Sequence, residues 1–162
     1  MRAPAPTPLA ERRRGPALAL LVACRPKQWV KNLLVFAAPG AAGVLGNPDD
    51  LLATVGAFVA FCLAASATYL VNDAHDVEAD RAHATKRHRP IASGELSIGF
   101  ALAAAAVFAL ASLAVSVAVR PQLALVVVGY VALTTTYSAV LKHVVILDVV
   151  ALASGFVLRA VA

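Results

Sequence analysis

Four of the nine acidic side chains in this 162-residue sequence fall within one octet: Asp73, Asp76, Glu78 and Asp80. Carboxylates this close together repel one another unless a cation or a set of hydrogen-bond donors compensates them. Their hard oxygen atoms suit Mg²⁺, which binds only one or two carboxylates and completes its shell with water and substrate phosphates. The octet therefore predicts half of a site for a magnesium-bound diphosphate.

A helix that continues through the octet would turn most of these groups to one side. Successive residues of an α-helix are rotated by about 100°, so Asp76, Asp80 and Asp73 follow Asn72 at about 40°, 80° and 100°. Glu78 points away at about 240°. The predicted metal ligands are therefore Asn72, Asp73, Asp76 and Asp80.

The alternative is a solvated helix end whose acids pair with nearby bases, namely Arg81, Lys86 and Arg87. Asn72 argues against this alternative, because an amide beside three carboxylates, directly after an apolar segment, is more than solubility requires. Ionisable groups at that depth are costly and are functional by default.

Basic side chains lie on both sides of the acids. The loop after them reads Lys86-Arg87-His88-Arg89-Pro90-Ile91-Ala92-Ser93-Gly94, and an earlier segment reads Arg25-Pro26-Lys27-Gln28-Trp29-Val30-Lys31-Asn32. Arg binds phosphate oxygens as a bidentate fork, and Lys binds them as a point charge. Lys27 and Lys31 are four residues apart and would share one face of an α-helix. Phosphate binding and anchoring at a membrane surface are both open for these residues.

A third polar patch runs from Tyr137 to Lys142 and is followed by Asp148. Asp148 lies inside an apolar run, where a carboxylate needs a partner such as Lys142 or Arg159.

Long apolar segments separate the polar patches. Apolar residues make up 60% of the chain and charged residues only 14%, which is too little polar surface for an ordinary soluble domain. Because a membrane crossing needs roughly 20 apolar residues, we predict an all-α, polytopic transmembrane helical bundle. Its five crossings here are expected at about 29–46, 51–71, 97–119, 121–141 and 144–162.

The distribution of Lys and Arg predicts the orientation. Seven of them lie before Asn32, where the uncharged part of the first crossing begins, and four more lie between the second and third crossings. Cytoplasmic loops are enriched in Lys and Arg, so the N-terminus and the 72–96 loop are expected on the cytoplasmic side of the plasma (inner) membrane. Residues 1–24 are expected to form a disordered or interfacial segment. Binding of nucleic acid is not expected, because the bases sit at membrane ends without a soluble domain to present them.

The motifs resemble those of the UbiA superfamily of intramembrane prenyltransferases. The resemblance rests on Asn72-Asp73-x-x-Asp76-x-x-x-Asp80, on the loop Lys86-Arg87-x-Arg89-Pro90-Ile91-x-x-Gly94 and on the element from Tyr137 to Lys142. It covers about residues 20–162. The segments 25–32, 67–73 and 155–160 look most like the members that transfer a 5-phosphoribosyl group to decaprenyl phosphate.

The resemblance implies a bundle of about nine helices with a central cavity that opens to the cytoplasm and to lipid. It implies that 5-phosphoribosyl 1-diphosphate gives its ribosyl group to a polyprenyl phosphate, with Mg²⁺ as cofactor, for the synthesis of cell-wall arabinan precursors. Membrane lipids would surround the bundle. The catalytic residues would be Asp73, Asp76 and Lys142, and the substrate-binding residues would be Lys27, Lys31, Asn72, Arg87, Arg89 and Tyr137.

This chain departs from the family pattern in one respect. The family carries a second acidic motif on a later helix, and these 162 residues do not contain it. We therefore expect the 162 residues to be an incomplete fragment or a truncated gene product that is inactive alone. The nearest alternative function is transfer of a prenyl group from a prenyl diphosphate to an aromatic acceptor. A cation transporter or channel and a structural membrane subunit are two further alternatives. Acceptor identity, lipid length and oligomeric state, including a homo-oligomer, stay open.

Overall fold

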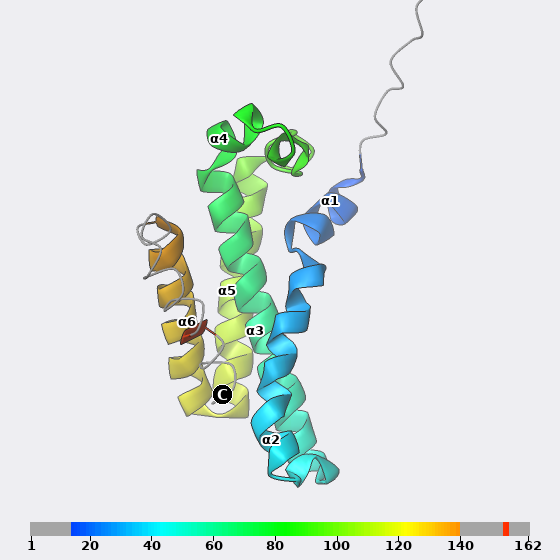
Figure 1. Ribbon diagram of the computed structural model, residues 1–162, viewed down its shortest axis with the longest axis vertical. Helices are drawn as coiled ribbons and strands as arrows, with labels where there is room; N and C mark the ends of the chain where they lie inside the picture. Colours follow the sequence, from blue (N-terminus) through cyan, green and yellow to red (C-terminus); the bar gives the residue numbers. More distant parts are fainter. Residues whose placement is uncertain (1–13, 140–153, 156–162) are drawn as a thin grey trace, which may run out of the picture.

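The computed structural model describes residues 14–139 and 154–155, with the backbone alone for 137–139. Its elements, in which η marks a 3₁₀ helix, are α1 (Pro16–Ala23), η1 (Pro26–Phe36), α2 (Ala37–Ala41), η2 (Val44–Gly46), α3 (Pro48–His75), α4 (Val77–Ala82), η3 (Lys86–His88), α5 (Ile98–Val119) and α6 (Pro121–Ala139). Every regular element in this described part is helical, as predicted. The long rods run side by side, and α1 and α4 lie at one end of them (Figure 1).

The helix α3 is the central rod, and it packs against η1, α5 and α6. It begins at a capped turn, because Asn47 accepts a hydrogen bond from the Asp49 amide at 2.9 Å and Pro48 occupies the first helical position. Both features favour a helix start at this point. In α5, Ser97 has the same capping role and accepts from the Phe100 amide at 3.3 Å.

Two helices, α3 and α5, are long and apolar enough to cross a membrane, and Pro121–Thr136 of α6 is a shorter apolar helix. Only 17% of the apolar window of α5 is buried, whereas a core helix of a soluble protein would be mostly buried. Exposed valine side chains such as Val107 and Val117 cover its outer surface, which suits contact with lipid. These helices occupy the segments expected at 51–71, 97–119 and 121–141. The segment expected at 144–162 lies almost wholly outside the described residues.

The segment expected as a crossing at 29–46 is not a continuous α-helix. It consists of η1, the short α2 and η2, and Pro39, Gly40 and Gly43 interrupt its second half. An 11-residue 3₁₀ helix is unusually long. Because a 3₁₀ helix rises by about 2.0 Å per residue, η1 spans roughly 22 Å and α2 adds roughly 8 Å. The combined length of η1 and α2 is therefore close to the thickness of a hydrocarbon core, about 30 Å.

The threefold repeat of η1 determines which of its side chains meet α3. Residues three apart eclipse one another in a 3₁₀ helix, so Trp29, Asn32 and Val35 share one face. The Trp29 indole donates to Ser66 Oγ at 3.2 Å, and the Asn32 amide donates to Cys62 Sγ at 3.3 Å. The expectation that Lys27 and Lys31 share a face is wrong, because residues four apart in this helix are about 120° apart.

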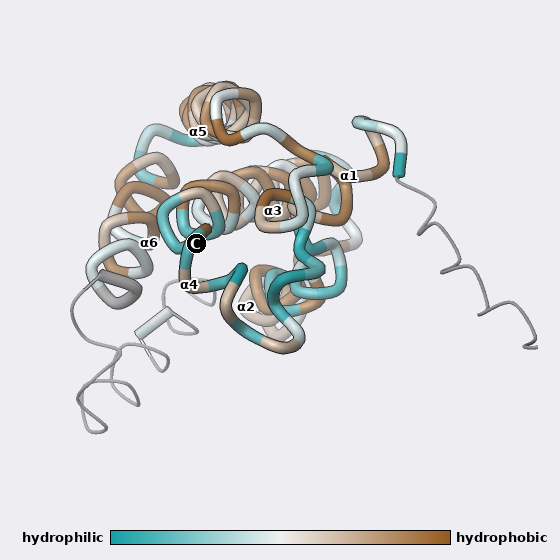
Figure 2. The backbone as a smooth tube through the Cα atoms, turned by 90° about the horizontal axis from the view of Figure 1, so that it is seen from above, coloured by the Kyte–Doolittle hydropathy of each residue, from teal (hydrophilic) through white to brown (hydrophobic). Residues whose placement is uncertain are grey.

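Two apolar clusters hold the bundle together. One lies at the α4 end and includes Ala19, Leu70 and Ile91, and the other lies farther along α3 and includes Phe61 and Tyr130. The rings of Phe61 and Tyr130 meet edge to face at 5.3 Å. Since α1 contributes to the first cluster, residues 16–23 form a packed helix. Of the two forms expected for the N-terminal segment, the interfacial one stays the prediction for these residues. Figure 2 shows the apolar rods and the hydrophilic segments around α4 from this end.

Gly56 provides a test of the packing between α3 and α5. A Cβ atom at this position would lie 2.5 Å from Val119 Cγ2, and a β-branched side chain has little rotamer freedom with which to move away. We expect Gly56→Ala to lower the free energy of unfolding by about 1–3 kcal/mol, measured by thermal or denaturant unfolding in detergent micelles. Gly129→Ala in α6 is the control, because its Cβ meets no atom within 4 Å. Equal stability of the two variants would contradict the packing.

Candidate functional site

Two buried carboxylates share one guanidinium group at the α4 end of the bundle. Arg89 Nη1 donates to Asp73 Oδ1 at 3.1 Å and to Asp80 Oδ2 at 2.6 Å. The two carboxylate side chains are only 4% and 3% exposed, so they have little water to screen their repulsion. The shared cation is what makes their close approach favourable.

The helix α3 ends inside the acidic octet, and a second helix begins there. The helix α3 ends at His75, Asp76 has φ −88° and ψ 12°, and α4 begins at Val77. The prediction of one continuous helix that turns four ligands to one face is therefore wrong. The break brings Asp80 back to Asp73 through Arg89, leaves Asp76 half-buried at the corner, and places Asn72 in the last turn of α3. His75 Nδ1 lies 3.0 Å from Asp76 Oδ1.

The loop after α4 positions Arg89 by means of its own anchors. Ile91 is buried in the cluster with Leu70 and Val77, and the Leu96 amide donates to the Pro90 carbonyl at 2.9 Å. Gly94 has φ +79°, a conformation that glycine adopts without steric cost. The sequence Arg89-Pro90-Ile91-x-x-Gly94 thus encodes an ion-pairing group, an apolar anchor and a turn.

Arg25 is a member of the site that the sequence analysis did not select. Its Nη2 donates to Asp73 Oδ1 at 2.5 Å, and its guanidinium lies 4.6 Å from the ring centroid of Tyr69. The residue stands between α1 and η1 with φ +54°. A base 48 positions from its acid gives no local sequence signal, so only the packing of α1 and η1 on α3 reveals the pair.

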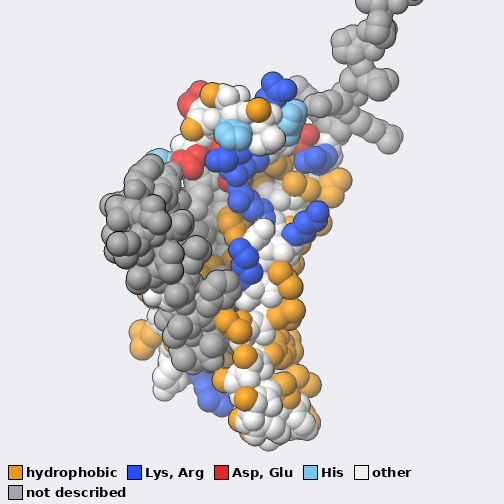
Figure 3. Space-filling model, viewed as in Figure 1, with side chains coloured by type: hydrophobic (Ala, Val, Ile, Leu, Met, Phe, Trp, Pro, Cys, Tyr) orange, Lys and Arg blue, Asp and Glu red, His pale blue; other side chains and the backbone are white. Residues whose placement is uncertain are grey.

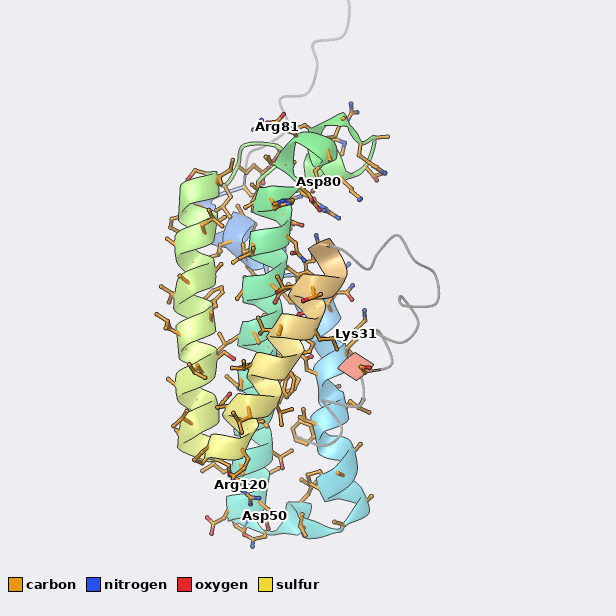
Figure 4. All side chains as sticks on the ribbon, turned by 90° about the vertical axis from the view of Figure 1, so that its left-hand side faces the viewer. Lys31, Asp50, Asp80, Arg81 and Arg120 are labelled. Atoms are coloured by element: carbon orange, nitrogen blue, oxygen red, sulfur yellow. The ribbon has the colours of Figure 1, made fainter. Side chains whose placement is uncertain are left out.

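Of the other predicted phosphate ligands, those whose side chains the structure describes do not lie at the buried acids. Lys27 and Lys31 are exposed on η1, and Lys31 lies farther along the bundle than Asp80 (Figure 4). Arg87 is exposed on η3, where its Nε donates to His88 at 3.3 Å. Tyr137 lies in α6, where only the backbone is described, and Lys142 lies outside the described residues.

Charged side chains nevertheless gather at this one end. Figure 3 shows Lys, Arg, Asp and Glu around α4, with Lys and Arg side chains also along the visible face below it. Asp50 and Arg120 mark the opposite end (Figure 4). The suggested solvated helix end, with its acids on Arg81, Lys86 and Arg87, does not describe Asp73 and Asp80, because these pair with Arg25 and Arg89. Arg81 pairs with Glu78 instead.

An apolar cavity of about 710 Å³ lies between α3, α5 and α6. Its walls are mainly alanine, valine and leucine side chains, including Ala67, Ala105 and Val131. Asn72 and Thr68 line it at the α4 end, one residue and five residues before Asp73. The cavity therefore places an apolar volume directly beside the charged cluster.

The donor set fits a metal ion that is shared with a ligand. Among the residues that the structure describes, no three His, Cys, Asp or Glu side chains are spaced to hold a metal by themselves. However, Asp73 and Asp80 already converge on one cationic nitrogen, and Mg²⁺ needs only one or two carboxylates when phosphates and water supply the other ligands. The site fits Mg²⁺ bound together with a diphosphate and does not fit a cage made of protein alone.

Comparison with known proteins gives consistent matches. Residues 33–162 match the model of the UbiA prenyltransferase family, which confirms the resemblance inferred from the motifs. The chain is 50% identical over 147 residues to the decaprenyl-phosphate phosphoribosyltransferase of Mycolicibacterium smegmatis, covering 88% of this chain and 46% of that protein. The proteins of the same name from Corynebacterium glutamicum and Mycobacterium tuberculosis are 48% identical (88% of this chain, 44% of theirs) and 49% identical (86% and 48%). The chain spans about half the length of these relatives.

Removal of the shared cation tests the site as a structural unit. Arg89→Gln leaves two buried carboxylates without their common partner, so we expect the free energy of unfolding to fall by about 2–4 kcal/mol. The control Arg87→Gln removes the same charge from an exposed position two residues away, and we expect a change below about 0.5 kcal/mol. Thermal and denaturant unfolding in detergent measure both, and similar losses in the two variants would contradict the bridge.

Proposed function

The chain belongs to the UbiA prenyltransferase family, and we propose that its α4 end binds a magnesium-bound diphosphate for transfer of a group to a membrane lipid. As a member of this family, it is an all-α membrane protein. The donor in the proposal is 5-phosphoribosyl 1-diphosphate and the acceptor is decaprenyl phosphate or a related polyprenyl phosphate. One observation carries the proposal: Asp73 and Asp80 share Arg89 at the α4 end, where Asn72, the chain neighbour of Asp73, lines an apolar cavity.

In this reaction the ribosyl C1–O bond to the diphosphate breaks, and the electron pair leaves with the diphosphate. A phosphate oxygen of the lipid forms the new bond to C1, so the protein needs no covalent nucleophile. Asp73, Asp76 and Asp80, with Asn72, would hold Mg²⁺, which would neutralise charge on the departing diphosphate. Arg25 and Arg89 are cations beside the carboxylates, and their guanidinium groups can bind phosphate oxygens. The role of the protein is then electrostatic and positional.

The apolar cavity supports a lipid acceptor. A polyprenyl chain can lie against the walls between α3, α5 and α6, while its phosphate reaches the polar end at Asn72. Burial of the chain there is favourable in proportion to the apolar area covered. In the proposal this end faces the cytoplasm at the plasma membrane, and the product feeds the synthesis of cell-wall arabinan. The remaining candidate phosphate ligands are Lys27, Lys31, Arg87, Tyr137 and Lys142.

The assay that tests this function uses a chimera as well as the chain alone. Residues 1–162 replace the matching half of the Mycolicibacterium smegmatis relative, to which they are 50% identical over 147 residues. Labelled 5-phosphoribosyl 1-diphosphate, decaprenyl phosphate and Mg²⁺ should yield label that extracts with lipid, and a chelator should abolish it. Label that passes instead from a prenyl diphosphate to an aromatic acceptor would contradict the proposal in favour of prenyl transfer.

Asp76 and Glu78 form a matched pair for mutation in this chimera. Asp76 lies at the helix break beside the buried acids, whereas Glu78 is exposed and pairs with Arg81. We expect Asp76→Asn to lower kcat/KM roughly 100-fold or more, because an electrostatic contact to the reacting groups is lost. Glu78→Gln should leave kcat/KM within about twofold of the parent. Equal rates for the two variants would exclude Asp76 from the site.

A further inference from the structure

Resting on the proposed function, we propose that Arg25 is a positioning residue which occupies Asp73 in the ligand-free protein and moves to a phosphate oxygen when a metal-bound diphosphate enters. It would thereby couple the binding of the metal to the binding of the anion. Neither the motif analysis nor the chemistry of the acids alone assigns this role. Three features of Arg25 support it: its hydrogen bond to Asp73, its contact with Tyr69 and its backbone conformation.

The first observation is that two guanidinium groups serve a single carboxylate oxygen. Both Arg25 Nη2 and Arg89 Nη1 donate to Asp73 Oδ1, at 2.5 and 3.1 Å. Arg89 also has Asp80 as an acceptor, so it stays paired if Arg25 leaves. Arg25 is therefore the exchangeable partner of Asp73, and Arg89 is the permanent one.

The second observation is that the Arg25 guanidinium has a stabilising contact that does not depend on Asp73. Its guanidinium lies 4.6 Å from the ring centroid of Tyr69, one turn before Asp73 in α3. A cation above an aromatic face is stabilised there without an anion. The side chain is also 30% exposed, against 4% for Asp73. It can consequently turn toward an entering phosphate while the tyrosine still supports it.

The third observation is the backbone of Arg25. Its φ of +54° lies in the left-handed region, which costs a residue with a Cβ roughly 1–2 kcal/mol, and Pro26 follows it directly. Hydrogen bonds from the Arg25 amide to the Val22 carbonyl and from the Gln28 amide to the Arg25 carbonyl hold the turn, at 3.1 and 2.8 Å. Strained backbone of this kind concentrates at functional positions. Here the strained turn directs the guanidinium at Asp73.

These contacts have a consequence for the order of binding. A resident positive charge on Asp73 opposes a divalent cation at the same oxygen, so the metal alone should bind weakly. A diphosphate supplies acceptors for the Arg25 guanidinium, so that Asp73 Oδ1 keeps only Arg89 as a guanidinium partner and becomes accessible to the metal. Metal and anion should then bind with positive coupling, and by linkage each raises the affinity of the other by the same factor.

The test measures Mn²⁺, as a probe for Mg²⁺, on the chimera described above (the parent) in detergent micelles by electron paramagnetic resonance, with and without inorganic diphosphate. Without diphosphate, Arg25→Gln should bind Mn²⁺ roughly tenfold tighter than the parent chain, because the competing charge is gone. Arg25→Lys keeps the charge and should stay near the parent. With diphosphate present, the gain in Mn²⁺ affinity should be smaller in Arg25→Gln than in the parent. Arg81→Gln, which removes a charge paired with Glu78, should match the parent.

Arg25→Gly protects the test against misfolding, because glycine accepts the left-handed φ without strain and also lacks the charge. It should show the same tighter binding of Mn²⁺ as Arg25→Gln. Unchanged Mn²⁺ affinity in both charge-free variants, in a parent chimera that does bind Mn²⁺ with diphosphate, would overturn the role of Arg25 alone. Failure of the parent chimera to bind Mn²⁺ with diphosphate, or equally tight binding by its Asp73→Asn variant, would overturn the proposed function as well.

Discussion

Two carboxylates held together at the end of an apolar helix are the constraint on which the site depends. Asp73 and Asp80 are nearly inaccessible to water and would repel each other strongly without Arg89 between them. To meet that demand, α3 must stop at His75, α4 must turn back, and the following loop must return Arg89 to the same point. Ile91 and Gly94 are the means by which it returns. The shape of this end of the bundle follows from the need to neutralise buried charge.

The sequence predicted the elements whose signals are local. The charge-free runs identified α3, α5 and α6, because an apolar segment of that length has no other stable arrangement in lipid. The crowded acids located the ion-paired cluster of Asp73 and Asp80, since four like charges in eight positions require compensation; its role as a metal site stays a prediction. The family resemblance also followed from contiguous motifs. The membrane orientation stays a prediction.

The features that the sequence did not predict depend on tertiary packing. The acidic octet contains no proline or glycine, so the sequence carries no local signal for the helix break. Arg89, which forms the ion pair with Asp80, comes from the loop after α4. The 3₁₀ conformation of η1 is evident only from its packing on α3, where Trp29 donates a hydrogen bond to Ser66 and Asn32 donates one to Cys62. From the sequence alone, Arg25 is indistinguishable from a basic residue that anchors the chain at the membrane surface, and only the fold shows its hydrogen bond to Asp73. Each of these features depends on contacts with another element of the fold, which periodicity does not encode.

The central claim is that the paired acids give up a guanidinium partner and receive a metal with its diphosphate. The direct measurement is a structure of the full chimeric protein with Mn²⁺ and 5-phosphoribosyl 1-diphosphate, with the ion located by its anomalous signal. The account predicts Mn²⁺ within about 2.5 Å of an oxygen of Asp73 or Asp80, and a guanidinium nitrogen of Arg25 on a phosphate oxygen. An ion bound elsewhere, with Arg25 still on Asp73 and Arg89 on both carboxylates, would contradict it.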